Sequence, residues 1–260
     1  MSRHIARKRF GQNFLIDRQI IGEIVRAISP QYDDFVVEIG PGLGALTEPL
    51  LDRIGHLHVI EIDRDIVARL RRQHSSERLT IHEGDVLGFD FDALALKAKK
   101  KMRIVGNLPY NISTPLLFHL ASSANHVHDM HFMLQKEVVE RLVAEPGTAD
   151  YGRLSVMMQY RFMMDRLLDV PPDSFDPAPQ VDSAVIRLIP LPPGELTVRN
   201  EELFSAIVAA AFGQRRKMLR NTLKGFVNET VYMKLEILPT ARAEELTVAD
   251  YVRLTNAIAR

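Results

Sequence analysis

Short apolar runs alternate with amphipathic segments over the first two thirds of the chain, and no other feature of the sequence constrains the fold as strongly. The segments between the runs have helical periodicity, as in Ile66–Gln73 and Pro115–Ala121. Runs that are apolar throughout are typical of parallel strands covered on both faces. The alternation therefore predicts a doubly wound α/β sheet with right-handed crossovers. The predicted strands are Phe35–Ile39, His58–Ile62, Leu79–His82, Arg103–Val105 and Met130–Leu134.

Two further runs follow these repeats instead of standing among them. Arg166–Val170 and Ala184–Leu191 are predicted strands that close the sheet with an antiparallel edge. A proline-rich stretch at 190–194 then interrupts regular structure and marks a linker. We therefore predict an α/β domain over residues 1–192 and a second domain over residues 193–260.

The chain beyond the linker has helical patterns and no strand pattern. Glu201–Phe212 carries an apolar helical stripe, which Gly213 breaks, and a second helix is predicted over Lys217–Phe226. The spacing i, i+4, i+8 places three basic side chains on one face of that helix. They are Arg216, Arg220 and Lys224. The second domain is therefore predicted to be small and all-helical.

Basic side chains gather in two segments of a chain whose formal net charge is +0. The overall charge gives no reason to expect a nucleic acid, whereas each segment offers cations that could contact its phosphates. A solvated surface is the alternative reading of either segment alone. The RNA-binding candidates are Arg7, Lys8, Arg9, Arg215, Arg216, Lys217 and Arg220.

The composition excludes several classes of protein. With 0 cysteines the chain has no disulfide framework and no cysteine-ligated zinc or iron–sulfur site. Its basic N-terminus lacks the apolar core of a signal peptide, and no run approaches the ~20 apolar residues that a membrane span requires. The 9 histidines show no metal-ligand spacing. We expect a cytoplasmic, monomeric protein without a metal.

A glycine-rich turn follows the first predicted strand. Val36–Ile39 leads into Gly40, Gly42 and Gly44, and then into a predicted helix over Ala45–Leu51. Open α/β sheets bind ligands at the carboxyl ends of their strands, and a Cβ in such a turn would block the approach of the backbone to a ligand. The turn predicts a cofactor site, although the spacing also satisfies the looser fingerprint of NAD enzymes.

Acidic residues follow the next two predicted strands. Glu61 stands where a carboxylate can accept hydrogen bonds from ribose hydroxyls, and Asp85 where it can accept one from an adenine amino group. S-adenosylmethionine and NAD share both groups. Each acid alone is also explained as a turn or cap residue.

The segment Asn107–Tyr110 follows the fourth predicted strand and distinguishes a methyltransferase from a dehydrogenase. An adenine amino nitrogen is a poor nucleophile because its lone pair is delocalised into the ring. The Asn107 side-chain oxygen and the Leu108 carbonyl could accept hydrogen bonds from the two hydrogens of this amino group and stabilise the positive charge that develops on methyl transfer. Pro109 restricts Leu108 and so limits the direction of that carbonyl. The alternative interpretation is that Asn107–Tyr110 is an ordinary turn between a strand and a loop.

Two aromatic residues could hold a purine taken out of its helix. Tyr110 offers one ring, and base–aromatic stacking contributes about 1–3 kcal/mol per base. Phe175, in a loop stiffened by prolines, could cover the other face of the base, unless it is a core residue. No strong general base is needed, so positioning does most of the catalytic work.

Taken together, these motifs resemble the KsgA/RsmA family of small-subunit ribosomal RNA adenine N6-dimethyltransferases, and the resemblance runs over nearly the whole chain. It includes the basic stretch at 213–221, which distinguishes this family from the related 23S rRNA adenine methyltransferases of the macrolide-resistance type. The matching segments are Arg7–Leu15, Glu38–Gly44, Glu61–Asp63, Gly84–Val86, Asn107–Ser113, Phe175–Ser183 and Gly213–Leu223.

The resemblance implies a Rossmann-like seven-stranded methyltransferase domain with a helical C-terminal domain. It also implies transfer of four methyl groups from S-adenosylmethionine to two adjacent adenosines near the 3′ end of 16S rRNA, in an assembling 30S subunit. The implied catalytic residues are Asn107, Leu108, Pro109, Tyr110 and Phe175. The predicted cofactor-binding residues are Asn13, Leu15, Gly40, Gly42, Glu61, Ile62, Asp85, Val86 and Asn107.

Three other functions remain open at this point. The chain also resembles 23S rRNA adenine methyltransferases of the macrolide-resistance type, which share Gln12–Leu15 and an Asn-x-Pro-Tyr motif. It could act mainly as a 30S assembly factor, a role that its basic segments would also serve. An NAD-dependent dehydrogenase is the third.

Overall fold

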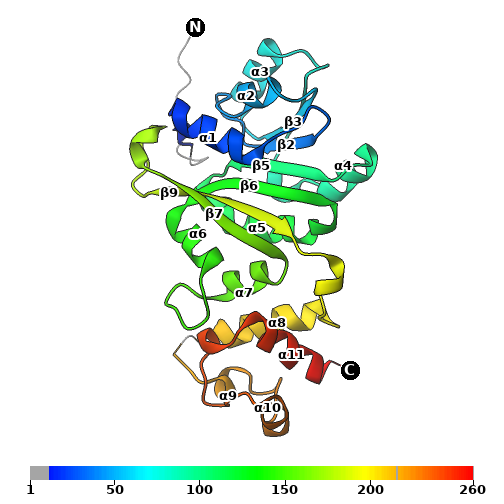
Figure 1. The fold of residues 1–260 in the computed structure, drawn as a ribbon, viewed down its shortest axis with the longest axis vertical. Coiled ribbons are helices and arrows are strands. Elements are labelled where there is room, and N and C mark those ends of the chain that lie inside the picture. The colour runs from blue at the N-terminus through cyan, green and yellow to red at the C-terminus, as the bar shows by residue number, and fades with distance from the viewer. Residues whose placement is uncertain (1–11, 215, 260) are drawn as a thin grey trace. The chain divides into compact units, whose positions relative to one another are not determined.

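The computed structural model describes residues 12–214 and 216–259 (Figure 1). The described chain forms two compact units. The first contains the N-terminal part of the chain as far as Val139 together with Met164–Pro190, and the second contains Glu140–Met163 and the chain from Leu191 onward. None of the helices in these described residues is both long and apolar enough to span a membrane.

A seven-stranded sheet in the order β4-β3-β2-β5-β6-β9-β7 forms the centre of the first unit. The first five of these strands pair in parallel, and β9 pairs antiparallel with β6. The predicted doubly wound sheet and its antiparallel edge are therefore confirmed. The strands are β2 (Phe35–Ile39), β3 (Leu57–Glu61), β4 (Leu79–Glu83), β5 (Met102–Asn107), β6 (Val127–Gln135), β7 (Phe162–Val170) and β9 (Ser183–Pro190).

Helices cover both faces of this sheet, with α1 and α5 on opposite faces (Figure 1). Several begin at an acidic cap: Asp17 accepts hydrogen bonds from the first turn of α1, and Asp63 and Asp90 do the same for α3 and α4. The predicted helices at 66–73 and 115–121 are confirmed within longer ones. The helices are α1 (Arg18–Ile28), α2 (Thr47–Leu51), α3 (Arg64–Gln73), α4 (Phe91–Ala98), α5 (Ser113–Ser122) and α6 (Lys136–Val143).

Gly106 lets the two central strands approach each other. A Cβ at this position would lie 2.5 Å from the Ile39 carbonyl oxygen, closer than such atoms come. The chain order reverses between these strands, β2 and β5, and at such a reversal the carboxyl ends of an α/β sheet leave a crevice for ligands.

The chain also forms a separate two-stranded sheet, which the sequence patterns did not predict. In it β1 (Phe14–Leu15) pairs antiparallel with β8 (Phe175–Asp176), so Leu15 stands opposite Phe175. Strands of two residues are too short to show a hydrophobic period, and only their pairing identifies them.

The second unit is helical, and its core contains the buried Tyr151, Phe204, Tyr232 and Tyr251. The predicted helix Glu201–Phe212 is confirmed as α8. The unit also takes in the segment Glu140–Met163, although we predicted its start at residue 193, because Val156 and Tyr160 pack into this core. Its helices are α7 (Arg153–Gln159), α8 (Glu201–Phe212), α9 (Leu219–Thr222), α10 (Glu229–Leu235) and α11 (Val248–Ile258).

The predicted helix over Lys217–Phe226 is wrong. Only the short α9 forms there, because Met218 is extended, with a ψ of 152°, and forms a bridge with Arg242, so that the helix begins at Leu219 and ends at Thr222. Gly225 then takes a φ of +94°, outside the helical region. The basic side chains of this stretch therefore do not share one face of a long helix.

Candidate active site

A cavity of about 340 Å³ lies in the first unit, at the carboxyl ends of β2, β3, β4 and β5. This volume falls at the lower end of the range for small-molecule pockets, roughly 300–1,000 Å³. Every residue predicted to bind a cofactor lines the cavity, and Leu108, Pro109 and Tyr110 line it too. The predicted cofactor-binding residues that line the cavity are Asn13, Leu15, Gly40, Gly42, Glu61, Ile62, Asp85, Val86 and Asn107.

The glycine turn keeps part of this cavity free of side chains. Gly42 has a φ of +55°, a conformation that L side chains rarely adopt, and a Cβ there would lie 3.1 Å from the ring of Phe14. Gly40 has a φ of +64°, and a Cβ there would lie 3.9 Å from the main-chain oxygen of Asn107. A ligand can therefore lie against bare backbone at this turn.

Glu61 presents a fixed carboxylate at the end of β3. Its side chain is 6% exposed, and the backbone N–H of Asp63 donates to its Oε1 at 2.8 Å. Burial raises the pKa of Glu61, while hydrogen bonds from the backbone of Asp63, Gly42 and Ile62 lower it. The apolar side chain of Ile62 is 45% exposed beside it. A carboxylate next to an apolar surface suits a ribose joined to a flat base.

Asp85 lines the cavity and also caps a short helix. One of its carboxylate oxygens accepts from the Leu87 N–H at 3.0 Å, at the start of the 3₁₀ turn Val86–Gly88. Both readings of this residue from the sequence are therefore compatible with its position. The hydrogen bond fixes the carboxylate, and its second oxygen is left for other donors.

Glu38 is a cavity residue that the sequence reasoning missed. It is 2% exposed, and the Thr47 hydroxyl donates to its Oε2 at 2.6 Å. Burial raises the pKa of Glu38 to about 8, the hydrogen bond from Thr47 opposes this, and the nearby Glu61 adds to it. The signal in the sequence was a single acid in an apolar strand directly before the glycine turn.

The N-terminal strap, residues 12–15, lies along the cavity. Gln12 Nε2 donates to Asp63 Oδ2 at 3.2 Å, and Asn107 Nδ2 donates to the Asn13 carbonyl at 2.9 Å. The strap thus connects the ends of β3 and β5, and its last residue, Leu15, pairs with Phe175.

The turn Asn107–Tyr110 is held by several hydrogen bonds. The Leu108 N–H donates to the Met133 carbonyl at 3.1 Å, and the Pro109 carbonyl accepts from the Ile112 N–H at 3.2 Å. Because the Asn107 amide nitrogen is bonded to Asn13, its Oδ1 is the atom left to accept a hydrogen bond from a ligand. This turn can therefore offer acceptors to an amino group.

Tyr110 stands at the cavity with its ring half-buried. Its hydroxyl lies 2.7 Å from Ser183 Oγ, at the start of β9. Burial raises the pKa of Tyr110, and the hydrogen bond with Ser183 lowers it. The bond to β9 limits the rotation of the phenol and so sets the plane of the ring.

Phe175 does not line the cavity, which corrects the prediction that it stacks on a base. Its side chain is 3% exposed and packs in the core of the first unit with Leu15 and Val170. The pairing of β1 with β8 accounts for this, because it turns the ring toward the core.

The basic candidates in the described part of the chain do not line the cavity. Arg7, Lys8, Arg9 and Arg215 lie outside the described residues. Arg216, Lys217 and Arg220 are exposed in the second unit. Among the described side chains, no group of three or more His, Asp or Glu residues could hold a metal ion.

Comparison with known proteins gives a consistent result. A family model described as ribosomal RNA adenine dimethylase matches residues 3–260. The chain is 61% identical over 256 residues to ribosomal RNA small subunit methyltransferase A of Dechloromonas aromatica, covering 98% of this chain and 99% of that protein. It is 63% identical over 259 residues to the protein of the same name from Aromatoleum aromaticum, covering 100% and 96%.

Two solved structures resemble the whole chain. One is a dimethyladenosine transferase from Plasmodium falciparum, with a TM-score of 0.79, 26% identity, and coverage of 93% of this chain and 95% of that one. The other is the 23S rRNA methyltransferase ErmE, with a TM-score of 0.69, 25% identity, and coverage of 95% and 99%. Both likenesses extend over the two units described here.

Proposed function

Because the chain belongs to the ribosomal RNA adenine dimethylase family, we propose that it transfers four methyl groups from S-adenosylmethionine to two adjacent adenosines near the 3′ end of 16S rRNA. Family membership makes the protein an S-adenosylmethionine-dependent methyltransferase of ribosomal RNA adenine. The substrate that we propose is the RNA within an assembling 30S subunit, which also assigns the protein to the cytoplasm.

One observation carries this proposal: the turn after β5 lines one cavity with Asn107, Leu108 and Tyr110, which carry an amide oxygen, a main-chain carbonyl and an aromatic ring. The amide nitrogen of Asn107 is bonded to Asn13, which leaves Oδ1 as an acceptor. Leu108 and Tyr110 line the same cavity. An adenine amino group has two hydrogens to donate and a flat ring to stack, so this set matches it.

The cavity fits S-adenosylmethionine. The bare backbone at Gly40 and Gly42 leaves room for the amino-acid part of the cofactor, and the Glu61 carboxylate can accept from its ribose hydroxyls. We assign the adenine to the side of the cavity formed by Ile62, Asp85 and Val86. Asn13 and Leu15 close the cavity from the strap.

When bound, S-adenosylmethionine would supply a methyl group on a positively charged sulfur, with a neutral thioether as the leaving group. In the proposed mechanism Asn107 Oδ1 and the Leu108 carbonyl accept hydrogen bonds from the two amino hydrogens and stabilise the positive charge that forms on the nitrogen. Tyr110 holds the base plane in line with the methyl group. The proton then leaves to solvent, so no residue acts as a strong base.

The exposed basic residues of the second unit are proposed to contact the RNA backbone. Arg216, Lys217 and Arg220 are exposed, and the N-terminal Arg7, Lys8 and Arg9 add to the positive charge available. Each phosphate contact that replaces a counterion makes binding weaker as salt rises. Affinity for the particle should therefore fall steeply with salt concentration.

The relatives favour the small subunit over the 23S alternative. The proteins named ribosomal RNA small subunit methyltransferase A are 57–63% identical to this chain over nearly its whole length. The 23S enzyme ErmE is 25% identical. We therefore assign the target adenosines to 16S rRNA.

The test is to incubate the protein with labelled S-adenosylmethionine and either undermethylated 30S subunits or 50S subunits. Nucleosides from the RNA are then identified by mass spectrometry. We expect N6,N6-dimethyladenosine from 30S subunits alone. Label only on 50S subunits would favour the 23S alternative. Salt-sensitive binding to 30S subunits without any label would favour an assembly factor.

A further inference from the structure

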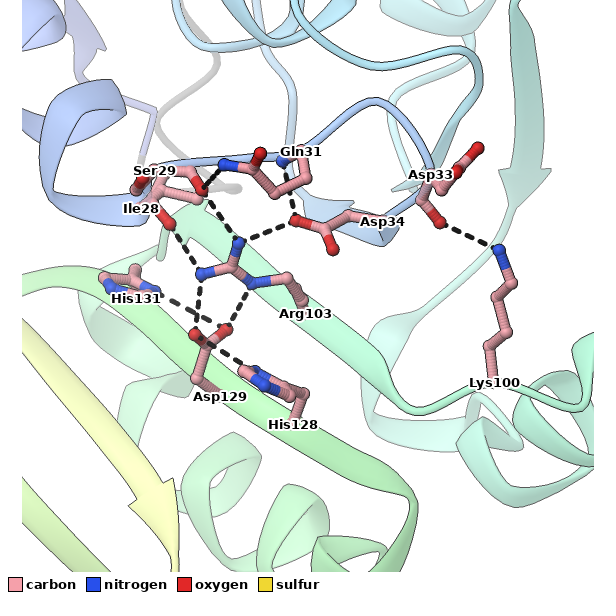
Figure 2. Close-up of polar contacts among 10 residues, drawn as sticks. All are labelled: Ile28, Ser29, Gln31, Asp33, Asp34, Lys100, Arg103, His128, Asp129 and His131. Atoms are coloured by element: carbon pink, nitrogen blue, oxygen red, sulfur yellow. Dashed lines mark hydrogen bonds and ion pairs between the residues drawn. The ribbon is translucent and has the colours of Figure 1, made fainter.

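Arg103, on β5, is a buried cation whose hydrogen-bonding capacity is fully used (Figure 2). It is 9% exposed, and a guanidinium has five N–H donors. Three bonds go to carboxylates: two to Asp129, at 2.9 and 2.7 Å, and one to Asp34, at 2.7 Å. The other two go to the carbonyls of Ile28, at 2.5 Å, and Ser29, at 3.3 Å.

The two carbonyls belong to the C-terminal end of α1. The last carbonyls of a helix have no partner within the helix, and a cation there is favoured by the helix dipole. Ser29 ends α1 in the left-handed conformation, with a φ of +48°. Arg103 therefore supplies a cation and two donors to this end of the helix, and the two carboxylates compensate its charge. The Ser29 carbonyl also accepts from Gln31 Nε2, at 3.1 Å.

Asp129 is in turn surrounded on β6. His128 Nδ1 lies 3.3 Å from its Oδ2, and His131 Nδ1 lies 3.9 Å from its Oδ1 (Figure 2). Arg103, reaching Asp129 from β5, is its nearest partner and the one that makes hydrogen bonds to both of its oxygens. The guanidinium fork has one orientation that satisfies all of these partners.

The other end of α1 continues the strap at the cavity. Only Ile16 and the cap residue Asp17 separate Leu15 from the first residue of the helix. The strap is bonded to β5 as well, through Asn107 and the Asn13 carbonyl. Because alternate residues of a strand face the same side, Arg103 and Asn107 share one face of β5. This single strand therefore holds the segment 13–29 at both ends.

The polar contacts decide where α1 lies along the sheet. Its apolar face, Ile24, Val25 and Ile28, is almost fully buried, but hydrophobic attraction is not directional and tolerates sliding and rotation. Hydrogen bonds weaken steeply with distance and angle. The Arg103 fork thus sets the register of a rigid 11-residue helix, and the helix transmits that register to the strap.

We propose that Arg103 is a positioning residue for the cofactor site, which fixes α1 along the sheet and thereby holds the strap against the cavity. The proposal rests on the proposed function only in taking S-adenosylmethionine as the occupant of that cavity. Arg103 itself stands at the opposite end of β5 from Asn107 and is absent from the lining of the cavity.

The decisive variant is Arg103→Met combined with Asp129→Leu. Arg103→Met alone would leave the buried carboxylate of Asp129 without its guanidinium partner and could fail to fold, whereas replacing a buried ion pair by apolar side chains is often neutral for stability. The carboxylate of Asp34 is 25% exposed and can be hydrated in the variants. The control is Arg187→Met with Asp165→Leu, which removes a more exposed ion pair of 2.7 Å between β9 and β7 by the same substitutions. Arg103→Lys is a second variant, because it keeps the charge but loses the planar fork.

Four quantities are measured on the full-length proteins: the melting temperature, the Kd for S-adenosylmethionine by calorimetry, the steady-state kinetics with 30S subunits, and hydrogen exchange of the peptide covering residues 12–17. For the folded double variant we expect the Kd and the KM for the cofactor to rise about tenfold. We expect kcat at saturating cofactor to stay within about twofold, because the acceptors at Asn107 and Leu108 are retained. Exchange at the strap should become faster.

Arg103→Lys should change the same quantities in the same direction by a smaller factor, and the control pair should leave them unchanged. A folded double variant with unchanged Kd and unchanged exchange at the strap would overturn the proposal. So would an equal effect in the control pair. Failure of the wild-type protein to bind the cofactor or methylate 30S subunits would instead reject the proposed function, and hydrogen exchange would still report whether Arg103 holds the strap.

Discussion

The side-chain amide of Asn107 donates a hydrogen bond of 2.9 Å to the main-chain carbonyl of Asn13, across 94 residues of sequence. The bond joins the turn after β5 to the N-terminal strap. It also fixes which way the amide points, because its nitrogen is the donor and Oδ1 is left on the other side. The same residue thus closes the cavity and supplies the proposed acceptor for the target amino group.

Replacing Asn107 by Ala is expected to affect both tasks. Loss of one preorganised acceptor typically lowers kcat by roughly 10²–10³. Release of Asn13 should also weaken cofactor binding, by about fivefold for a net loss of about 1 kcal/mol. Steady-state kinetics and calorimetry check the two effects separately. Asn125→Ala, an exposed asparagine that does not line the cavity, is the control. A kcat within twofold of the wild type would exclude the proposed role of Asn107.

Tyr110 and Ser183 are predicted to act as a pair. Their hydroxyl groups are 2.7 Å apart, so either Tyr110→Phe or Ser183→Ala removes the same hydrogen bond. Each change should lower kcat/KM for 30S subunits about fivefold, which corresponds to about 1 kcal/mol. The double variant should lose no more than either single one. Additive losses in this cycle would show that the bond does not orient the ring.

Gly106→Ala is expected to destabilise the first unit. The added Cβ would meet the Ile39 carbonyl oxygen at 2.5 Å, and overpacking of a core typically costs 1–3 kcal/mol, here about 2 kcal/mol. Urea denaturation measures the change. Gly88→Ala, where a Cβ would have nothing within 4 Å, is the control and should have little effect. Equal stability of the two variants would contradict the close approach of β2 and β5.

Glu38 is predicted to make stability depend on pH. Burial raises its pKa in the folded protein to about 8, above the usual 4.5. A carboxyl group whose pKa is raised in the folded protein contributes its full stabilisation of the fold below pH 4.5. This contribution is lost as the pH rises through 8, because over that range the unfolded chain binds fewer protons than the folded protein. Between pH 6 and 8.5 the loss should be on the order of 2 kcal/mol.

The free energy of unfolding of wild type and Glu38→Gln at both pH values provides the measurement. Gln keeps an acceptor for Thr47 and does not ionise, so the variant should gain stability relative to wild type as the pH rises. Glu48→Gln, at a side chain that is 59% exposed, serves as the comparison. A constant difference between wild type and Glu38→Gln across this range would show that the carboxyl is not held neutral by burial.

The sequence by itself determined the types of element and the composition of the cavity. Strands and helices can be predicted from the local periodicity of apolar residues. The cofactor residues follow directly after strands, and the carboxyl ends of parallel strands lie at one edge of the sheet. This is why Gly42, Glu61, Asp85 and Asn107 could be grouped before the fold was known.

Only the tertiary structure decided how the remaining groups are used. Burial of Phe175, the direction of the Asn107 amide and the five bonds of Arg103 depend on partners that lie 26–160 residues away in the chain. The chain at 217–226 has a helical pattern, yet Met218 is extended and bridges to Arg242, so only Leu219–Thr222 is helical. Local patterns specify which secondary structure a segment can form. The burial of a side chain and the geometry of its hydrogen bonds depend on the distant groups that the fold brings into contact with it. Contacts between distant segments leave no periodic signal in the sequence.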